Sequence, residues 1–196
     1  MIIIAITGGI GSGKTFVSNL LKERGIPIYN TDDEAKRLML SDMEIRRDLI
    51  ALLGREVYQD GSLNKPLLAS YLFADVRNTA QINRIVHPRV KADFIRWMET
   101  YRNYEIVGME CAILFEAGFE DVVDSVVMVY APESLRVERA MIRDHATESQ
   151  IRARIAAQMN DEVKCKRSDF VIYTDGRFSI NDQLTTLLEQ IKHKKM

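Results

Sequence analysis

The sequence predicts an α/β fold: a five-stranded parallel sheet flanked by helices, with a helical insert and a small helical lid. Three features support this prediction, namely short apolar runs, helical patterns between them, and a glycine-rich loop after the first run. Strands that alternate with helices are typical of a parallel sheet, because parallel strands need crossover connections, which are normally right-handed. The expected strands are residues 2–6, 26–29, 106–113, 126–130 and 169–173.

The first strand leads into a glycine-rich loop. Its run Ile-Ile-Ile-Ala-Ile is apolar throughout, as expected of a strand that is buried on both faces. The segment Gly8–Thr15 then fits the Walker A or P-loop pattern, G-x-x-x-x-G-K-[ST], and an amphipathic helix follows that ends at Gly25. Because strand, loop and helix come in the order that the motif requires, we expect a P-loop NTPase fold.

The loop has the composition of a phosphate site. Glycines allow the backbone to approach a phosphate closely, and the loop N–H groups and the positive end of the helix face the anion. Lys14 is expected to contact the β- and γ-phosphates of ATP, and the Thr15 hydroxyl is expected to bind Mg²⁺. The expected ATP-binding residues of the loop are Gly11, Ser12, Gly13, Lys14, Thr15 and Phe16. The alternative is a glycine-rich turn that binds nothing.

An acidic cluster follows the second expected strand. Thr31 and Glu34 have the spacing of a capping box, which predicts a helix with Asp32 in its first turn. Asp32 would then lie at the carboxyl end of a strand, where open α/β sheets bind their ligands. It is therefore a candidate general base for an acceptor hydroxyl. The alternative is that Asp32 only stabilises its own helix.

Residues 33–104 have the pattern of helices throughout. Asp60–Gly61 marks a turn, and Pro88 predicts a kink in the last of these helices. A helical block of this length exceeds what a βαβ crossover needs. We interpret it as an acceptor-binding insert in a nucleotide-binding core of residues 1–32 and 105–196. The alternative is that the block only covers the sheet.

The third expected strand carries an acidic residue, which P-loop enzymes use to help hold Mg²⁺. Two residues qualify: Glu110 within the strand and Glu116 shortly after it. The sequence does not decide between them. A further possibility is that Glu116 caps a short helix that follows.

Two consecutive arginine-bearing helices are interpreted as a lid of about residues 136–160. Arg136, Arg139 and Arg143 share one face of the first helix, and a capping box at Thr147–Gln150 starts the second. Guanidinium groups suit bidentate contacts with phosphate, so a lid of this kind would close over the nucleotide. The alternative is a solvated face on which the arginines pair with neighbouring glutamates.

Composition and charge exclude several classes of protein. The 196 residues are 46% hydrophobic and 28% charged with a net charge of −1, which fits a soluble globular protein and gives no case for a nucleic-acid or membrane partner. The two cysteines, Cys111 and Cys165, lack metal-ligand spacing, and a disulfide is not expected. We expect a cytoplasmic protein without signal peptide or membrane span.

The chain resembles the dephospho-CoA kinase family over nearly its whole length. Seven segments carry the resemblance: Thr7–Lys14, Asp32, His87–Pro88, Ile113–Glu116, Arg139 with Arg143–Asp144, Arg154–Gln158, and Asp169–Gly176. The P-loop alone would not distinguish this family from other P-loop kinases, but the combination does. The resemblance implies transfer of the ATP γ-phosphoryl group to the 3′-hydroxyl of dephospho-CoA, the last step of coenzyme A biosynthesis.

The resemblance also implies roles for individual residues. Asp32, Lys14 and Arg143 would be catalytic, Arg139 and Arg143 would bind ATP, and Asp32 and His87 would bind the acceptor. The implied ligands are ATP, dephospho-CoA and Mg²⁺, with a monomer or weak homo-oligomer as the expected state. Phosphoryl transfer depends mainly on positioning and on neutralising charge, which fits this set of residues.

The chain departs from the family pattern at a few positions. Asn30 replaces the first Asp of a strand-end Asp-x-Asp, so Asp32 lacks a second carboxylate beside it. Glu110 and Ala112 stand where the family often has Asp and Pro, and Thr174 stands where it has an Asn. A Glu at position 110 could still reach Mg²⁺ through water.

Two other functions fit parts of the sequence. One is a P-loop kinase that acts on another small molecule, such as a nucleoside, but the insert with His87–Pro88 argues against it. The other is a nucleotide-dependent switch. A GTPase would need an Asn/Thr-Lys-x-Asp motif after a late strand, and Tyr130–Glu133 does not fit that motif.

Overall fold

The computed structural model describes residues 1–193, and its backbone separates into two compact units. One unit comprises Met1–Tyr29 and the described chain from Tyr101 onward; the other is Asn30–Thr100. Residues 194–196, at the end of the expected nucleotide-binding core, lie outside the described part.

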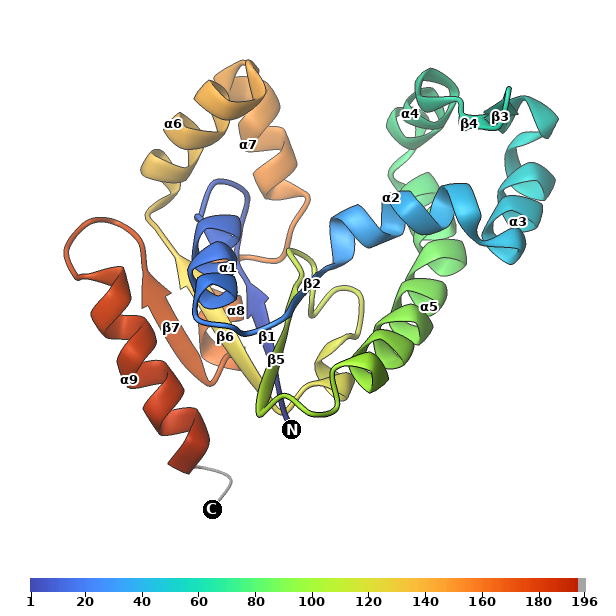
Figure 1. Cartoon of the computed structure of the whole chain (residues 1–196). Coiled ribbons are helices and arrows are strands. Elements are labelled where there is room, and N and C mark those ends of the chain that lie inside the picture. The colour runs from blue at the N-terminus through green and yellow to red at the C-terminus, as the bar shows by residue number, and fades with distance from the viewer. Residues whose placement is uncertain (194–196) are drawn as a thin grey trace. The chain divides into compact units, whose positions relative to one another are not determined.

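The first unit contains a five-stranded parallel sheet in the order β2-β5-β1-β6-β7 (Figure 1), which confirms the predicted fold class. Its strands are β1 (Ile2–Thr7), β2 (Ile28–Asn30), β5 (Ile106–Glu110), β6 (Ser125–Tyr130) and β7 (Phe170–Tyr173). β1 is central: its Ile4 pairs with Gly108 of β5 on one side and with Ser125 of β6 on the other. A strand with neighbours on both sides and helices on its faces needs the unbroken apolar run seen in the sequence.

Helices of the first unit pack on this sheet and form a helical hairpin beyond it (Figure 1). They are α1 (Lys14–Glu23), η2 (Glu120–Val122), α6 (Glu133–Asp144), α7 (Glu148–Ala156), α8 (Asp161–Arg167) and α9 (Ile180–His193). Val17 and Leu21 of α1 and Leu184 and Leu187 of α9 belong to one buried cluster with the strand residues. This core anchors the start of α1, and therefore the loop before it.

The third strand is shorter than expected, because it ends at Glu110 rather than at residue 113. The Cys111 N–H still donates to the Ile6 carbonyl at 3.0 Å, and the chain then leaves the sheet in a series of turns. In these turns the Phe119 N–H bonds the Leu114 carbonyl at 2.9 Å. The apolar pattern does not distinguish this buried turn from a continued strand.

The second unit is mostly helical. Its elements are α2 (Thr31–Ser41), α3 (Met43–Leu53), η1 (Arg55–Val57), β3 (Tyr58–Gln59), β4 (Ser62–Leu63), α4 (Lys65–Ala74) and α5 (Val76–Thr100). The prediction of helix throughout was wrong at one place: the Asp60–Gly61 turn joins the small antiparallel pair β3–β4. Both turn residues have positive φ, 49° and 78°, as a two-residue hairpin loop requires. Pro88 lies inside α5 without ending it.

The helix that carries Asp32 is capped by a different residue than expected. Thr31 is the first residue of α2 rather than its cap, and Asn30 is the cap. The Asn30 Oδ1 accepts hydrogen bonds from the N–H groups of Asp32 and Asp33 at 3.0 and 3.1 Å. Asn30, which departs from the family pattern, therefore caps α2, a role that an Asp at this position could also fill.

We expect Asn30→Ala to lower the free energy of unfolding by about 1 kcal/mol, because two N–H groups at the start of α2 lose their acceptor. Urea denaturation followed by circular dichroism measures this loss. Asn30→Asp is the matched control, since its carboxylate can accept the same bonds and should preserve stability. Equal stability of wild type and Asn30→Ala would contradict the capping role.

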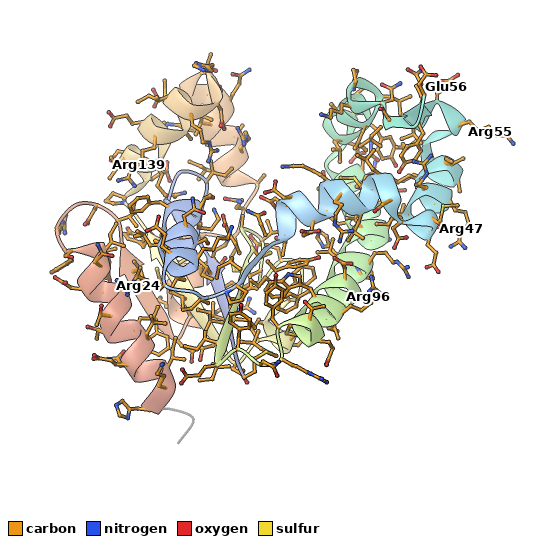
Figure 2. All side chains as sticks on the ribbon, viewed as in Figure 1. Arg24, Arg47, Arg55, Glu56, Arg96 and Arg139 are labelled. Atoms are coloured by element: carbon orange, nitrogen blue, oxygen red, sulfur yellow. The ribbon has the colours of Figure 1, made fainter. Side chains whose placement is uncertain are left out.

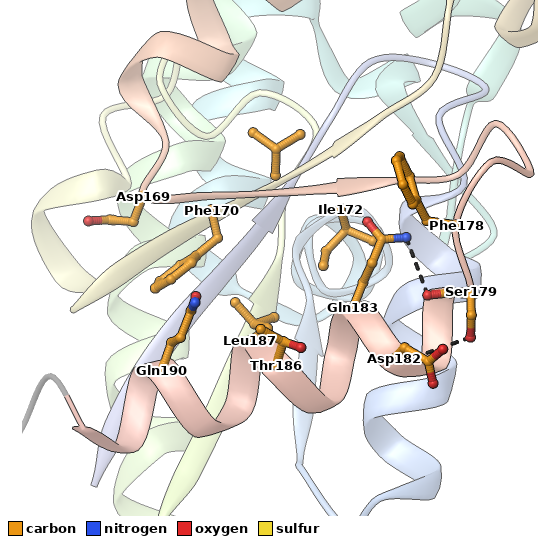
Figure 3. Close-up of a pocket in the computed structure, with 11 residues that line it drawn as sticks. Asp169, Phe170, Ile172, Phe178, Ser179, Asp182, Gln183, Thr186, Leu187 and Gln190 are labelled. Carbon is orange, nitrogen blue, oxygen red and sulfur yellow. Dashed lines mark hydrogen bonds between the residues drawn. The ribbon is translucent and has the colours of Figure 1, made fainter.

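The edge strand β7 is partly covered by a side chain of α9. Gln183 accepts a hydrogen bond from the Tyr173 N–H at 2.8 Å and donates one to the Tyr173 carbonyl at 2.9 Å. Beside it, a cavity of about 510 Å³ lies between β7 and α9, with Phe170, Ile172 and Leu187 among its lining residues (Figure 3). No residue of the glycine-rich loop lines this cavity.

Candidate active site

The glycine-rich loop connects β1 to α1 and has the backbone of a phosphate-binding loop. Gly13 is the residue before α1, with a φ of 91° that favours glycine. As a glycine it has no side chain that could cap α1 at this end. The positive end of the helix dipole is therefore directed into the loop, where an anion can bind.

Lys14 and Thr15 contact groups at the base of the loop. The Lys14 Nζ donates to the Gly9 carbonyl at 3.3 Å, so its ammonium lies across the loop. The Thr15 hydroxyl donates to the Glu110 Oε1 at 2.7 Å, and Glu110 is buried at the end of β5. A hydroxyl and a carboxylate are thus paired beside the loop, which is an oxygen donor set of the kind that Mg²⁺ prefers.

Glu116, the other acidic candidate, has different partners. It accepts a hydrogen bond from the Met159 N–H at 2.7 Å and pairs with Lys164 at 3.1 Å. Lys164 is fully buried and also donates to the Ala112 carbonyl at 2.7 Å. These contacts tie the turn after β5 to α8. Sequence reasoning missed this lysine, because a Lys in a short polar helix gives no signal of burial.

The three arginines expected on one lid face have three different environments. Arg136 is buried, donates to the Ile10 carbonyl at 3.2 Å and pairs with Asp161 at 3.0 Å. Arg139, labelled on α6 in Figure 2, donates to the Thr174 carbonyl at 2.7 Å and to its hydroxyl at 3.2 Å. Arg143 is exposed and binds the neighbouring Asp144 at 2.7 Å. Shared helical spacing did not distinguish these environments.

Asp144 holds the joint between α6 and α7. Its carboxylate contacts Arg143 and also Arg154 at 2.6 Å. The hydrogen bond from Arg143, and then that from Arg154, hold the pKa of Asp144 well below its ordinary value. His145, the next residue, adopts a left-handed conformation with φ of 50° that ends α6.

Thr174, another position that departs from the family pattern, contacts the loop. Its hydroxyl donates to the Ser12 carbonyl at 2.6 Å and accepts from Arg139. A Cβ added at Gly13 would lie 3.6 Å from the Thr174 side chain. The turn after β7 therefore joins the phosphate loop to α6.

The second unit contains the remaining predicted residues. Asp32 is the second residue of α2 and is exposed. His87 is half-buried in α5, and burial lowers the pKa of its imidazole, so the neutral form dominates at neutral pH.

Within residues 1–193, no cluster of three or more His, Cys, Asp or Glu side chains is arranged to hold a metal ion. None of the helices in that range combines the length and the apolar character that a membrane-spanning segment requires.

Comparisons with known proteins give a consistent result. A family model described as dephospho-CoA kinase matches residues 2–179. A Bacteroides fragilis protein named dephospho-CoA kinase is 50% identical over 191 residues, which cover 97% of this chain and 93% of that protein. The crystal structure of TT1252 from Thermus thermophilus matches with a TM-score of 0.80 at 33% identity, covering 96% and 97% of the two chains. A dephospho-CoA kinase from Campylobacter jejuni has a TM-score of 0.71 at 18% identity, covers 99% and 98%, and supports the fold alone.

Proposed function

We propose roles for the residues of this chain, which belongs to the dephospho-CoA kinase family. Its reaction is that of the family: the γ-phosphoryl group of ATP is transferred to the 3′-hydroxyl of dephospho-CoA. The resemblance seen in the sequence is thereby confirmed. The main support for the proposed roles is the structure of the loop before α1. The N-terminus of α1 is uncapped there, and the Thr15 hydroxyl contacts Glu110.

The phosphates of ATP would bind to the loop residues 11–16. Backbone N–H groups and the N-terminus of α1 would stabilise their negative charge without needing to reorient, which is the main way proteins catalyse phosphoryl transfer. Lys14 would leave the Gly9 carbonyl, its acceptor in this structure, for the β- and γ-phosphates. A charged acceptor makes a stronger hydrogen bond with an ammonium than a neutral carbonyl does.

Thr15 and Glu110 fit a site for Mg²⁺. The Thr15 hydroxyl would bind the ion directly, and Glu110 would do so through water; Glu116 is committed to Lys164 and Met159 instead. Mg²⁺ usually keeps several waters and binds through one or two carboxylates plus substrate phosphates, so the lack of a larger acidic cluster in residues 1–193 fits this ion. When bound, Mg²⁺ would neutralise charge on the β- and γ-phosphates.

The acceptor would bind to the helical unit Asn30–Thr100, with His87 as one contact. Asp32 would accept the proton of the 3′-hydroxyl as that oxygen attacks the γ-phosphorus. Its support is its exposed carboxylate, two residues after the end of β2. Arg139 and Arg143 would contact the phosphates as α6 and α7 close over the nucleotide and exclude water, which otherwise competes as acceptor.

We expect Lys14→Ala to lower kcat/KM by at least about 100-fold, because a preorganised donor to the transferring phosphate is removed. The assay incubates enzyme with ATP, Mg²⁺ and dephospho-CoA and identifies the products by mass spectrometry. Lys22→Ala is the matched control, since this lysine is exposed on the last turn of the same helix. A Lys14→Ala protein with near wild-type turnover would refute the assignment of the loop.

A further inference from the structure

Both backbone polar groups of Ile10, in the middle of the loop, are held by side chains from distant parts of the chain. The Ile10 N–H donates to the Gln158 Oε1 at 3.1 Å. The Ile10 carbonyl accepts from the Arg136 Nη1 at 3.2 Å. Arg136 lies on the first turn of α6, and Gln158 lies two residues beyond the end of α7. The two side chains thus come from the two ends of the helical hairpin.

The loop packs directly against Arg136. A Cβ added at Gly9 would lie 2.2 Å from the Arg136 Nη1, and one added at Gly11 would lie 2.2 Å from the Arg136 carbonyl oxygen. The Walker A pattern allows any residue at these two positions. At Gly9 the close neighbour is the Arg136 guanidinium, so a side chain there would displace it. At Gly11 the neighbour is the backbone of residue 136, and a φ of 77° also favours glycine there.

Asp161 fixes the position of Arg136. The Arg136 Nη2 and the Asp161 Oδ2 are 3.0 Å apart, and both side chains are more than nine-tenths buried. Asp161 is the first residue of α8, which packs on β6. Arg136 is the first of three cations that stabilise the Asp161 carboxylate, ahead of Lys164 and Lys14. Removing Asp161 alone would leave the buried Arg136 guanidinium without its ion-pair partner, so the two residues are changed together.

We propose that Arg136 and Gln158 are positioning residues for phosphoryl transfer: they fix Ile10, and with it the direction of the loop N–H groups, while Asp161 fixes Arg136. The inference rests on the proposed function, since it requires that the loop holds the phosphates of ATP. The same contacts anchor both ends of the helical hairpin. A hairpin that closes over ATP therefore acts on the loop through these two side chains.

The test uses two variants and one control in the full-length enzyme. Arg136→Met/Asp161→Asn removes the donor to Ile10 without leaving a buried charge, and Gln158→Met removes the acceptor. Arg152→Met is the matched control, because Arg152 lies on α7 and pairs only with Glu133 and Glu148 among the described residues. The readouts are the dissociation constant for ADP, the KM for each substrate, kcat and the melting temperature.

We expect each test variant to weaken ADP binding and raise the KM for ATP by about tenfold, since each loses one hydrogen bond that positions the loop. The KM for dephospho-CoA should stay within about twofold of wild type, because the loop holds only the donor. Arg152→Met should match wild type in every readout.

Several outcomes would overturn the inference. A lower melting temperature with unchanged ADP affinity would show that Arg136 and Gln158 only stabilise the fold. If Arg136→Met/Asp161→Asn does not fold, the dissociation constant of Gln158→Met for ADP tests the inference, and a wild-type value would overturn it. Weak ADP binding by Lys14→Ala together with wild-type binding by both test variants would reject this inference and keep the proposed function. Wild-type ADP binding by Lys14→Ala would instead reject the proposed role of Lys14 in holding the phosphates of the nucleotide.

Discussion

Asp32→Asn is expected to lower kcat by about 10²–10⁴-fold, the usual contribution of a positioned general base. Asparagine keeps the size of the side chain but cannot accept the proton of the acceptor hydroxyl. The backbone N–H of Asp32 donates to the Asn30 Oδ1, and the substitution keeps this N–H, so the start of α2 should be unchanged. Steady-state kinetics with ATP and dephospho-CoA measures the loss, and calorimetric titration with ADP shows whether donor binding persists.

Asp33→Asn is the matched control for this prediction. Asp33 is the next residue, is also exposed, and donates its own N–H to Asn30, but its carboxylate pairs with Lys36 at 2.9 Å. It should therefore retain most of the activity. A larger loss for Asp33→Asn than for Asp32→Asn would end the assignment. A lower melting temperature for Asp32→Asn combined with a wild-type kcat would also contradict the assignment.

Arg143→Ala is expected to lower the rate of phosphoryl transfer by about 10³-fold or more, the effect of removing an arginine that stabilises the transition-state charge. Arg143 is exposed and contacts only Asp144 among the residues described, so its loss should change the melting temperature little. Single-turnover kinetics measures the transfer step without interference from product release.

The control for Arg143→Ala is Arg152→Ala on the next helix, whose ion pairs with Glu133 and Glu148 are exposed and of little energetic value. Arg139→Ala is less informative, because Arg139 also binds the Thr174 carbonyl and its loss would disturb the turn after β7. A change of only a few-fold in Arg143→Ala would favour the alternative that this arginine belongs to a solvated face.

Much of the fold follows from local patterns in the sequence. The apolar run before Gly8 and the stripe on α1 reflect burial in the same core, so pattern and structure agree there. α8 was missed because its sequence, Asp161–Arg167, is charged, and the side chains that it buries are Asp161 and Lys164. An amphipathic pattern detects only helices that bury apolar groups. The β3–β4 pair was missed because two-residue strands show no alternation.

The candidate site was predictable to a lesser extent. Lys14 and Thr15 belong to a local motif, so their spacing alone made them candidates. The partners Gln158 and Thr174 lie more than 140 residues along the chain from the loop groups that they contact, and no local pattern encodes such pairs. The environments of Arg136, Arg139 and Arg143 differ because each faces a different part of the folded chain, and one-dimensional spacing carries no such information.

The contact between Gln183 and β7 has a consequence for the enzyme at high concentration. An open edge strand offers its N–H and C=O groups to a strand from another molecule, and this is a common route to aggregation. At Tyr173 both groups are already bonded to the Gln183 amide, which imitates the backbone of a neighbouring strand. Two copies of the chain therefore cannot pair their β7 strands at this residue unless the Gln183 side chain first moves away.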